Sequence, residues 1–308
     1  MKKLWRFLKE RFAFWARKNK IEGDQNPKKK SAGTDLKSYP FLKWAGGKGQ
    51  MLKQYEAFFP AQFENFLEPF VGAGAVFFHL YNSGKIRPGK NAILIDSAED
   101  LMNCFDVIKN KVELLIKILR QPKYANDEKQ YYRIRAAEPA DPVGKAARTI
   151  YLNKTCFNGL FRVNSLGKFN VPFGKYRNPL ICDEENLRAV HQTLKNVHIL
   201  CSDFAACLRF AGKGDFVYFD PPYQPLSQTS RFTGYTKDSF SDEDQERLAE
   251  TYRMLGKVGC LVMLSNSDTP LVRKLYNGFR IEKVTAHRAI NSKSTGRGKI
   301  AELVILNY

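Results

Sequence analysis

The sequence lacks the paired cysteines of a disulfide framework. Its six cysteines, among 308 residues, form no CxxC pair and no cluster with histidine at zinc-ligand spacing. We therefore expect no disulfide, no structural metal and no metal partner. This usage is typical of reduced, mostly buried thiols in a cytosolic protein.

The sequence also lacks a hydrophobic run long enough to cross a membrane. Segment 1–35 has apolar residues at helical spacing, such as Leu4 and Leu8, but its longest uncharged run, Phe12–Ala16, is too short for a signal peptide. We expect a cytoplasmic protein with no membrane partner. We interpret 1–35 as a basic extension and linker, which is either dispensable or an added contact to a DNA backbone or a protein partner.

Acidic residues are few relative to basic ones. The chain has 31 Asp and Glu against 50 Lys and Arg residues, a formal net charge of +19 and a pI of about 9.6. Such an excess attracts a polyanion, and nucleic acid is the expected one. The length and a hydrophobic share of 44% suit one elaborated domain, or one domain with an insert.

Strand and helix patterns alternate after the extension, which indicates an α/β fold. A strand at 65–67 precedes Gly72 and Gly74, and a later strand ends at Asp96. Parallel sheets bind ligands at these strand ends. Phe77 replaces the third glycine of the dinucleotide fingerprint, which favours a nucleoside-type cofactor without a pyrophosphate over NAD. Asp96 is then a candidate for a ribose hydroxyl pair or, alternatively, a helix N-cap.

Two further acids follow predicted strands. Asp203 and Phe204 can hydrogen-bond to and stack on a purine, although an ordinary turn explains them equally well. The apolar strand 216–219 must stop at Asp220, because the two prolines that follow cannot continue a ladder. Asp220 is therefore predicted at the same rim as Gly72.

Five stretches in this order carry a family resemblance. They are "FLKWAGGKGQ" (41–50), "FLEPFVGAGAVFF" (66–78), "YLNKTCFNGLFRVNSLGKFNVPFGKY" (151–176), "SDF" (202–204) and "DPPY" (220–223). The chain from Tyr39 to Tyr308 resembles the S-adenosylmethionine-dependent DNA adenine-N6 methyltransferases of the Dam type (D12 class, alpha group). The resemblance implies a Rossmann-like methyltransferase fold with a mixed seven-stranded sheet and an inserted DNA-recognition domain of helices and a β-hairpin.

The DPPY residues suit chemistry on an exocyclic amine. The adenine N6 lone pair is delocalised into the ring, so the amine attacks a methyl sulfonium well only when acceptors hold its hydrogens. The Asp220 carboxylate and the Pro221 carbonyl can accept them, Pro222 stiffens the turn, and Tyr223 offers a stacking face. No cysteine follows a proline, as cytosine-C5 methylation commonly requires. The alternative is that DPPY only ends a strand.

The resemblance also implies a cofactor site for S-adenosylmethionine. It assigns Trp44 and Lys48 to the methionine end and Phe70 and Gly72 to the central loop. Asp96 corresponds to the ribose ligand, and Asp203 with Phe204 to the adenine ligands, while Asp220 borders the site. The "DSA" that begins at Asp96 departs from the "DIN"-like family pattern.

Methylation within a duplex requires the adenine to leave the base stack. By resemblance, Arg162, Leu160 and Pro172 read GATC and Lys43 contacts the first guanine, although Arg162 alone also suits a surface or phosphate contact. Phe157 corresponds to the aromatic residue that fills the gap, and a backbone clamp is formed by Asn158, Lys175 and Tyr176.

A Ser/Thr-rich loop at 231–240 precedes a helix for which Ser241 is the predicted N-cap. Such a loop can close over the flipped base, with Tyr235 and Phe240 as candidate contacts, or it is a surface connection.

The predicted organisation is a catalytic methyltransferase domain at 36–102 and 196–308, with a target-recognition domain at 103–195. Double-stranded DNA is the expected partner, and a cognate restriction endonuclease is a further candidate. Two alternatives stay open. The chain could act on another DNA sequence or on RNA, or it could be a DNA-binding homologue without activity.

Overall fold

A computed structural model describes residues 37–44, 46–87, 90–164, 166–225, 240–287 and 299–308. The predicted extension at 1–35 and the candidate contact Tyr235 lie outside these residues. No helix in the described part of the chain is long and apolar enough to cross a membrane.

The core of the fold is a seven-stranded mixed sheet with the strand order β3-β2-β1-β4-β5-β7-β6. The strands β3, β2, β1, β4 and β5 run parallel to one another, whereas β7 is antiparallel to both β5 and β6. The α/β prediction is therefore confirmed, as is the strand 216–219. The strands are β1 Phe66–Glu68, β2 Ala92–Asp96, β3 Val197–Cys201, β4 Phe216–Phe219, β5 Leu261–Ser267, β6 Arg280–His287 and β7 Lys299–Leu306.

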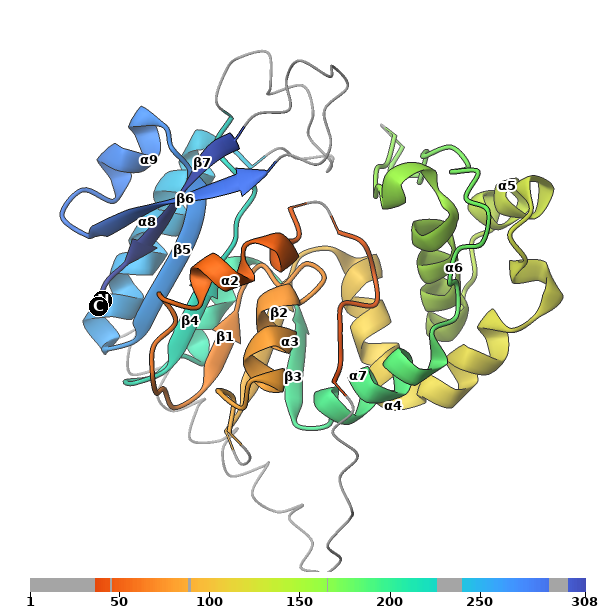
Figure 1. Cartoon of the computed structure of the whole chain (residues 1–308), viewed down its shortest axis with the longest axis horizontal. Helices are drawn as coiled ribbons and strands as arrows, with labels where there is room; N and C mark the ends of the chain where they lie inside the picture. Colours follow the sequence, from red (N-terminus) through yellow and green to blue (C-terminus); the bar gives the residue numbers. More distant parts are fainter. Residues whose placement is uncertain (1–36, 45, 88–89, 165, 226–239, 288–298) are drawn as a thin grey trace, which may run out of the picture.

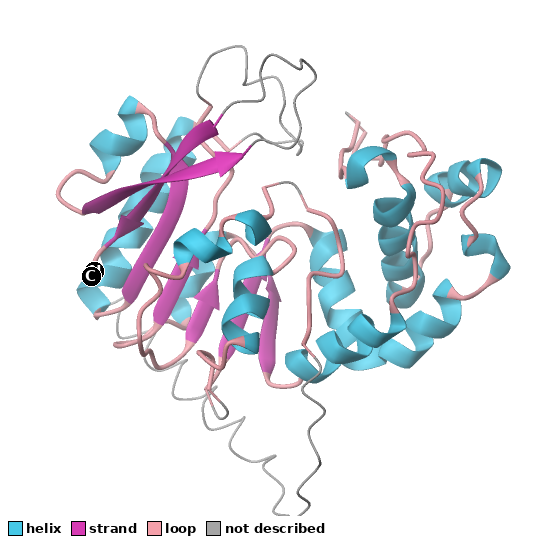
Figure 2. Cartoon of the chain, viewed as in Figure 1, coloured by secondary structure: helices cyan, strands magenta, loops and turns pink. Residues whose placement is uncertain are grey.

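Helices cover both faces of the sheet (Figures 1 and 2). The α-helices are α2 Leu52–Tyr55, α3 Ala75–Asn82, α4 Glu99–Leu119, α5 Glu128–Ala136, α6 Pro142–Thr155, α7 Glu184–Leu194, α8 Asp242–Val258 and α9 Pro270–Leu275. The short 3-10 turns are η1 Lys48–Gln50, η2 Pro122–Tyr124, η3 Phe157–Gly159 and η4 Phe204–Arg209. The predicted cap of α8 is confirmed, because Ser241 and Asp244 form a reciprocal capping box.

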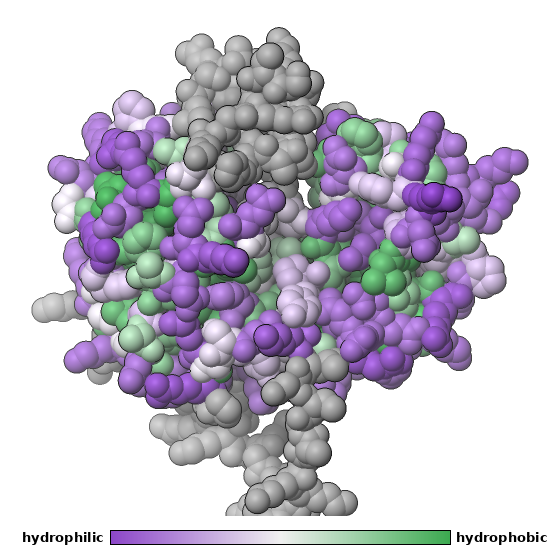
Figure 3. Space-filling view, viewed as in Figure 1, coloured by the Kyte–Doolittle hydropathy of each residue, from purple (hydrophilic) through white to green (hydrophobic). Residues whose placement is uncertain are grey.

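Alternating strand residues bury the two faces of the sheet in separate hydrophobic clusters. Phe66 and Phe216 pack in the cluster that contains α3 and α4, whereas their neighbours Leu67 and Val217 pack in the cluster of α8 and α9. Burial on both faces explains why the parallel strands are nearly continuous apolar runs. Hydrophilic residues cover most of the face of the molecule seen in Figure 3.

The strand order has a switch point between β1 and β4, where strand addition changes to the other side of β1. From β1 the chain proceeds outward to β2 and β3, and β4 then returns to the opposite side of β1. Ligands of open α/β sheets bind outside the carboxyl ends of strands at such a switch point. Glu68, Asp96 and Asp220 lie at or directly after the ends of β1, β2 and β4.

The region predicted for DNA recognition lies beyond β3 at one side of the sheet (Figure 1). Its predicted boundary at residue 103 falls inside α4, which packs against both α6 and α7. The predicted hairpin is present as antiparallel pairing at two points, Cys156 with Phe173 and Val163 with Phe169, without a continuous ladder.

We expect Asp215, directly before β4, to be a major contributor to stability. Its buried carboxylate accepts hydrogen bonds from the Asn65 backbone N–H at 3.0 Å, the Asn65 side chain at 2.8 Å and the Gly212 N–H at 2.7 Å. Asp215→Ala leaves these donors without an acceptor and should lower the free energy of unfolding by about 3 kcal/mol in urea titrations. Glu250→Ala, at an exposed position of α8, should change it by less than about 0.5 kcal/mol. Equal effects of both substitutions would contradict this role.

Candidate active site and DNA-facing surface

The Asp220 carboxylate lies just beyond β4 and is held at one oxygen. Oδ1 is 2.8 Å from the Lys48 ammonium and accepts a hydrogen bond from the Ser265 hydroxyl at 2.8 Å. No hydrogen bond from a described residue reaches Oδ2. The side chain is 18% exposed, so it is not sealed in the core. One carboxylate oxygen is therefore available to a donor that enters the site.

The electrostatics of Asp220 depend on this lysine. Burial raises the pKa of the Asp220 carboxyl above its ordinary value, while the Lys48 charge and the hydrogen bonds from Lys48 and Ser265 limit the rise. The negative charge of Glu302 acts in the opposite direction. Lys48 is itself almost fully buried, and its charge favours the ionised form of the carboxyl in a site that otherwise disfavours charge.

Pro222 and Tyr223, which follow Asp220, are held by side chains of other elements. The Pro222 carbonyl accepts a hydrogen bond from the Gln245 side chain at 3.1 Å, whereas no described residue donates to the Pro221 carbonyl. The Tyr223 ring lies 4.6 Å from the Lys48 ammonium, and its hydroxyl donates to Glu302 at 2.8 Å. Of the two proline carbonyls, the one at Pro221 is the free acceptor.

A buried amide network sets the course of the chain after the prolines. The Asn266 side chain accepts a hydrogen bond from the Gln224 backbone N–H at 3.1 Å and donates to the Gln245 side chain at 3.0 Å. The Ser267 hydroxyl donates to the Gln224 carbonyl at 2.6 Å. These groups come from β5 and α8, so the DPPY turn is held by two other elements.

The glycine loop after β1 is tied to the end of β2. The Gly72 N–H donates to Asp96 Oδ2 at 3.0 Å, and the Ala98 N–H donates to Asp96 Oδ1 at 3.0 Å. Ala98 is the N-cap of α4, so the N-cap alternative for Asp96 is wrong. A β-carbon at Gly72, where φ is 49°, would lie 3.1 Å from the Trp44 ring, which places Trp44 directly over the loop.

Glu68 is an unexpected acid at the centre of the site. It lies at the end of β1, is 2% exposed, and its Oε2 atom has no hydrogen-bond partner among the described residues. Burial, and next the charge of Asp220, raises the pKa of Glu68 well above its ordinary range. The apolar residues around this position in the sequence gave no reason to single it out.

The predicted purine-binding pair has close neighbours of its own. Both oxygens of Asp203 accept hydrogen bonds from Arg247 of α8 at 2.9 Å, and the guanidinium lies 4.4 Å from the centre of the Phe204 ring. Phe204 is buried against Phe70, with ring centres 5.3 Å apart, and against Phe240 at 6.0 Å. Arg247 is distant from Asp203 along the chain, so no local sequence pattern indicates this contact.

The residues predicted to read DNA lie on the irregular hairpin. Phe157 is exposed, as are Arg162 and Pro172, whereas Leu160 packs partly against the core. The Arg162 guanidinium donates through Nε to the Asn170 side chain at 2.8 Å, which directs it along the hairpin.

The predicted backbone clamp residues Asn158 and Lys175 both have positive φ angles, 55° and 53°. Left-handed backbone is uncommon outside glycine, so these two positions mark sharp turns at the base of the hairpin. Both side chains are exposed there.

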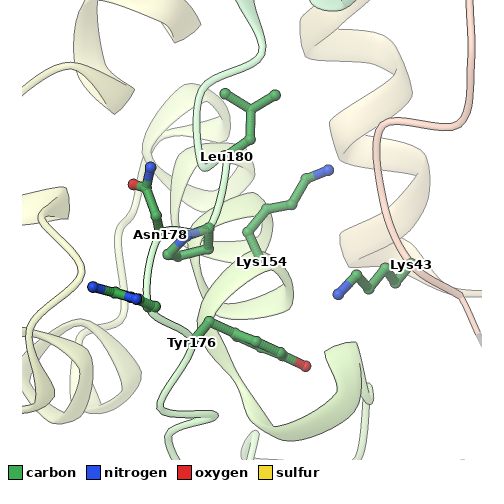
Figure 4. Close-up of a pocket in the computed structure, with 7 residues that line it drawn as sticks. Lys43, Lys154, Tyr176, Asn178 and Leu180 are labelled. Carbon is green, nitrogen blue, oxygen red and sulfur yellow. The ribbon is translucent and has the colours of Figure 1, made fainter.

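A basic hollow of about 330 Å³ lies between the hairpin base and the segment before η1 (Figure 4). Lys43 enters it from that segment, and its ammonium lies 4.8 Å from the centre of the Tyr176 ring. Lys154 of α6 also lines the hollow, and burial lowers the pKa of its ammonium. Lys43 and Tyr176 are thus brought together here, whereas Lys48 belongs to the Asp220 site.

Cations, acceptors and aromatic rings therefore gather in two places. The end of the sheet holds acids and phenylalanines, and the hairpin side holds arginine and lysine residues. No group of three or more His, Cys, Asp or Glu side chains in the described part of the chain could hold a metal ion.

Comparison with known proteins identifies a family. The model of the "D12 class N6 adenine-specific DNA methyltransferase" family matches residues 44–290. The chain is 48% identical to the Type II methyltransferase M.MjaIII of Methanocaldococcus jannaschii, over 87% of this chain and 99% of that protein.

Two further relatives are both named DNA adenine methylase. The one from Haemophilus influenzae is 36% identical, over 91% of this chain and 97% of its own length. The one from Escherichia coli is 36% identical, over 88% of this chain and 95% of its own length.

We expect Lys48→Met to shift the acidic limb of the pH–activity profile toward higher pH. In the role predicted for Asp220, the ionised carboxylate is the stronger acceptor for an N–H, and the pKa of Asp220 rises further once the Lys48 charge is lost. Single-turnover methyl transfer measured from about pH 5 to about pH 9 should also be about tenfold slower at neutral pH. Lys53→Met, at an exposed position of α2, is the control. An unchanged acidic limb in the Lys48 variant would argue against this coupling.

Proposed function

The chain belongs to the D12 class N6 adenine-specific DNA methyltransferase family, and from this premise we propose that it methylates adenine N6 at GATC in duplex DNA. The methyl group comes from S-adenosylmethionine, and the adenine is flipped out of the duplex before transfer. The observation that carries the proposal is the pair of free acceptors at Asp220 Oδ2 and the Pro221 carbonyl.

These two acceptors suit the two hydrogens of the N6 amine. With one hydrogen bonded to Asp220 and the other to the Pro221 carbonyl, the nitrogen lone pair turns out of the ring plane and toward the methyl group. Tyr223 provides a ring face for the adenine, and Glu302 fixes the orientation of that ring. The transferred methyl leaves an N6 cation, which loses one proton, and the Asp220 carboxylate is placed to accept it. Positioning supplies most of the rate, so no covalent enzyme intermediate is needed.

The groups at the sheet end fit S-adenosylmethionine. When bound, this cofactor supplies a methyl group on a sulfonium with a neutral thioether as the leaving group. The buried, unpartnered Glu68 oxygen suits a cationic methionine end, next to Trp44 and Gly72. Asp96 suits the ribose hydroxyl pair, and Asp203 suits a nucleobase amine.

Phe70 is half-buried at the loop, whereas Phe204 is covered by Phe70, Phe240 and Arg247. We therefore propose that the cofactor adenine stacks mainly on the Phe70 ring. Phe204 packs against the Phe70 ring and supports it.

Duplex recognition is assigned to the hairpin side. Arg162 pairs with a guanine through O6 and N7, and Leu160 with Pro172 contacts a thymine methyl group. Phe157, which is 51% exposed, fills the space left by the flipped adenine.

Lys43 reads the first guanine, and the DNA backbone is held by Asn158, Lys175 and Tyr176. The net charge of +19 favours the phosphates of any sequence.

Residues 103–195 would accordingly act as the target-recognition domain, and 36–102 with 196–308 as the catalytic domain. The segment 37–44 belongs to the catalytic part by sequence, yet it lies against α3, α6 and α7 through hydrogen bonds of Ser38, Lys43 and Tyr39. A restriction endonuclease that cuts the same site remains a proposed partner.

Methylation of a mixed-sequence plasmid tests activity and sequence choice together. The wild-type protein with S-adenosylmethionine should protect GATC sites from an endonuclease that methylation blocks, and should incorporate tritium from labelled cofactor. Asp220→Ala should lower the incorporation rate by about a thousandfold because it removes one of the two acceptors. Glu246→Ala, on the exposed face of α8, should behave as wild type. Incorporation without GATC protection would refute the sequence assignment, and equal rates for the Asp220 variant would refute its role.

Arg247→Ala should weaken the binding of S-adenosylhomocysteine, measured calorimetrically without DNA. The bidentate pair fixes the Asp203 carboxylate, and its loss should raise the dissociation constant by about tenfold. Arg253→Ala removes the same charge from an exposed position of the same helix and should leave binding unchanged. Identical affinities of the two variants would show that Arg247 does not support this site.

A further inference from the structure

Asn153 joins the DNA-facing hairpin to the segment that carries Lys43. Asn153 belongs to the last turn of α6 and is 2% exposed. Its side-chain oxygen accepts a hydrogen bond from the Lys43 N–H at 2.8 Å, and its amide nitrogen donates to the Lys43 carbonyl at 2.7 Å. The same nitrogen donates to the Gly159 carbonyl at 3.2 Å. One buried side chain therefore binds both peptide groups of Lys43 and the base of the hairpin.

The aliphatic part of the Lys43 side chain (its stem) and its ammonium group (its head) are held as well. A β-carbon at Gly159, where φ is 61°, would lie 2.5 Å from Lys43 Cδ, so the lysine stem runs directly across this glycine. The ammonium lies 4.8 Å from the centre of the Tyr176 ring (Figure 4). Backbone, stem and head of Lys43 are thus each fixed by a different residue of the recognition region.

This degree of constraint is unusual for an exposed lysine. A lysine head is a flexible point charge on a four-carbon stem, and its free side chain finds any nearby phosphate. Discrimination of one base over another requires the ammonium to be placed in advance, because the ordering cost otherwise reduces the gain from the correct base. Phe41 and Leu42 are buried and already anchor the segment, so the amide contacts to Lys43 act on the position of this residue.

We propose that Asn153 is a positioning residue for base recognition, which sets the place of the Lys43 ammonium and thereby the discrimination at the outer guanine of the site. The inference rests on the proposed function, in which Lys43 reads that guanine. Its effect is local to one base pair. Arg162, which is tethered separately by Asn170, keeps its own discrimination when Asn153 is changed.

The test compares methylation at single-base variants of the target. The preferred site of the wild-type protein is first determined from a library of random duplexes, and kcat/KM is then measured for this site and for each single-base change. Asn153→Ala should reduce discrimination at the outer base pair by about tenfold and match Lys43→Ala there. Discrimination at the other positions should be retained.

Gly159→Ala should displace the side chain of Lys43 without changing Asn153, because the added methyl group would clash with the aliphatic part of the lysine. It should reproduce the loss at the same base pair. Thr149→Val is the matched control, because Thr149 is a buried polar residue of the same helix that interacts with Cys104, away from Lys43. Thr149→Val should leave the ratio of kcat/KM between the preferred site and each single-base variant unchanged, even if the melting temperature falls.

Three outcomes would overturn the inference. The first is unchanged discrimination in Asn153→Ala when Lys43→Ala has lost it. The second is an equal loss at all positions in the Asn153 and Thr149 variants, which indicates a purely structural role. The third is a wild-type protein with no preference at the outer pair. A preferred site other than GATC that still shows this pattern would refute the proposed sequence while it supports the role of Asn153.

Discussion

The contact between Lys48 and Asp220 is the constraint on which the arrangement of the site depends. Burial of a carboxylate at the end of a strand favours its protonated form, and the Lys48 ammonium, 2.8 Å from Asp220 Oδ1, favours the ionised form. The same ammonium lies over the Tyr223 ring and helps to hold that ring in place. Since Lys48 comes from the segment that follows Lys43, the position of the acid depends on a part of the chain that also touches the recognition region.

The sheet and the hairpin side divide the chemistry between them. Acids and aromatic rings collect where the parallel strands end, because strand order brings β2, β1 and β4 together there. Basic residues collect on the irregular segment after α6, where exposed side chains can reach a polyanion. Asn153 binds both the segment that carries Lys43 and the base of the hairpin through a single amide. The overall positive charge therefore attracts DNA of any sequence, whereas in the proposed function a few constrained side chains provide the selectivity.

Much of the fold could be predicted, because local pattern and tertiary structure agree along the strands. The apolar run 216–219 and the strand that ends at Asp96 were both identified, since burial on two faces leaves a continuous apolar signal. The cap at Ser241 was also readable, because capping depends on residues three apart. The hairpin was harder, because its pairing is interrupted and its turns place Asn158 and Lys175 in left-handed backbone.

The sequence by itself determined which residues could do chemistry: the DPPY tetrapeptide, the glycine loop, the acids at strand ends and the basic hairpin are all contiguous or periodic features. Only the tertiary structure decided what each of them meets. Arg247 on Asp203, Ser265 on Asp220 and Asn153 on Lys43 are contacts between residues remote in the chain. Their partners are set by strand order and helix packing, and no local pattern records which distant side chain will fill the remaining hydrogen-bonding position of a buried group.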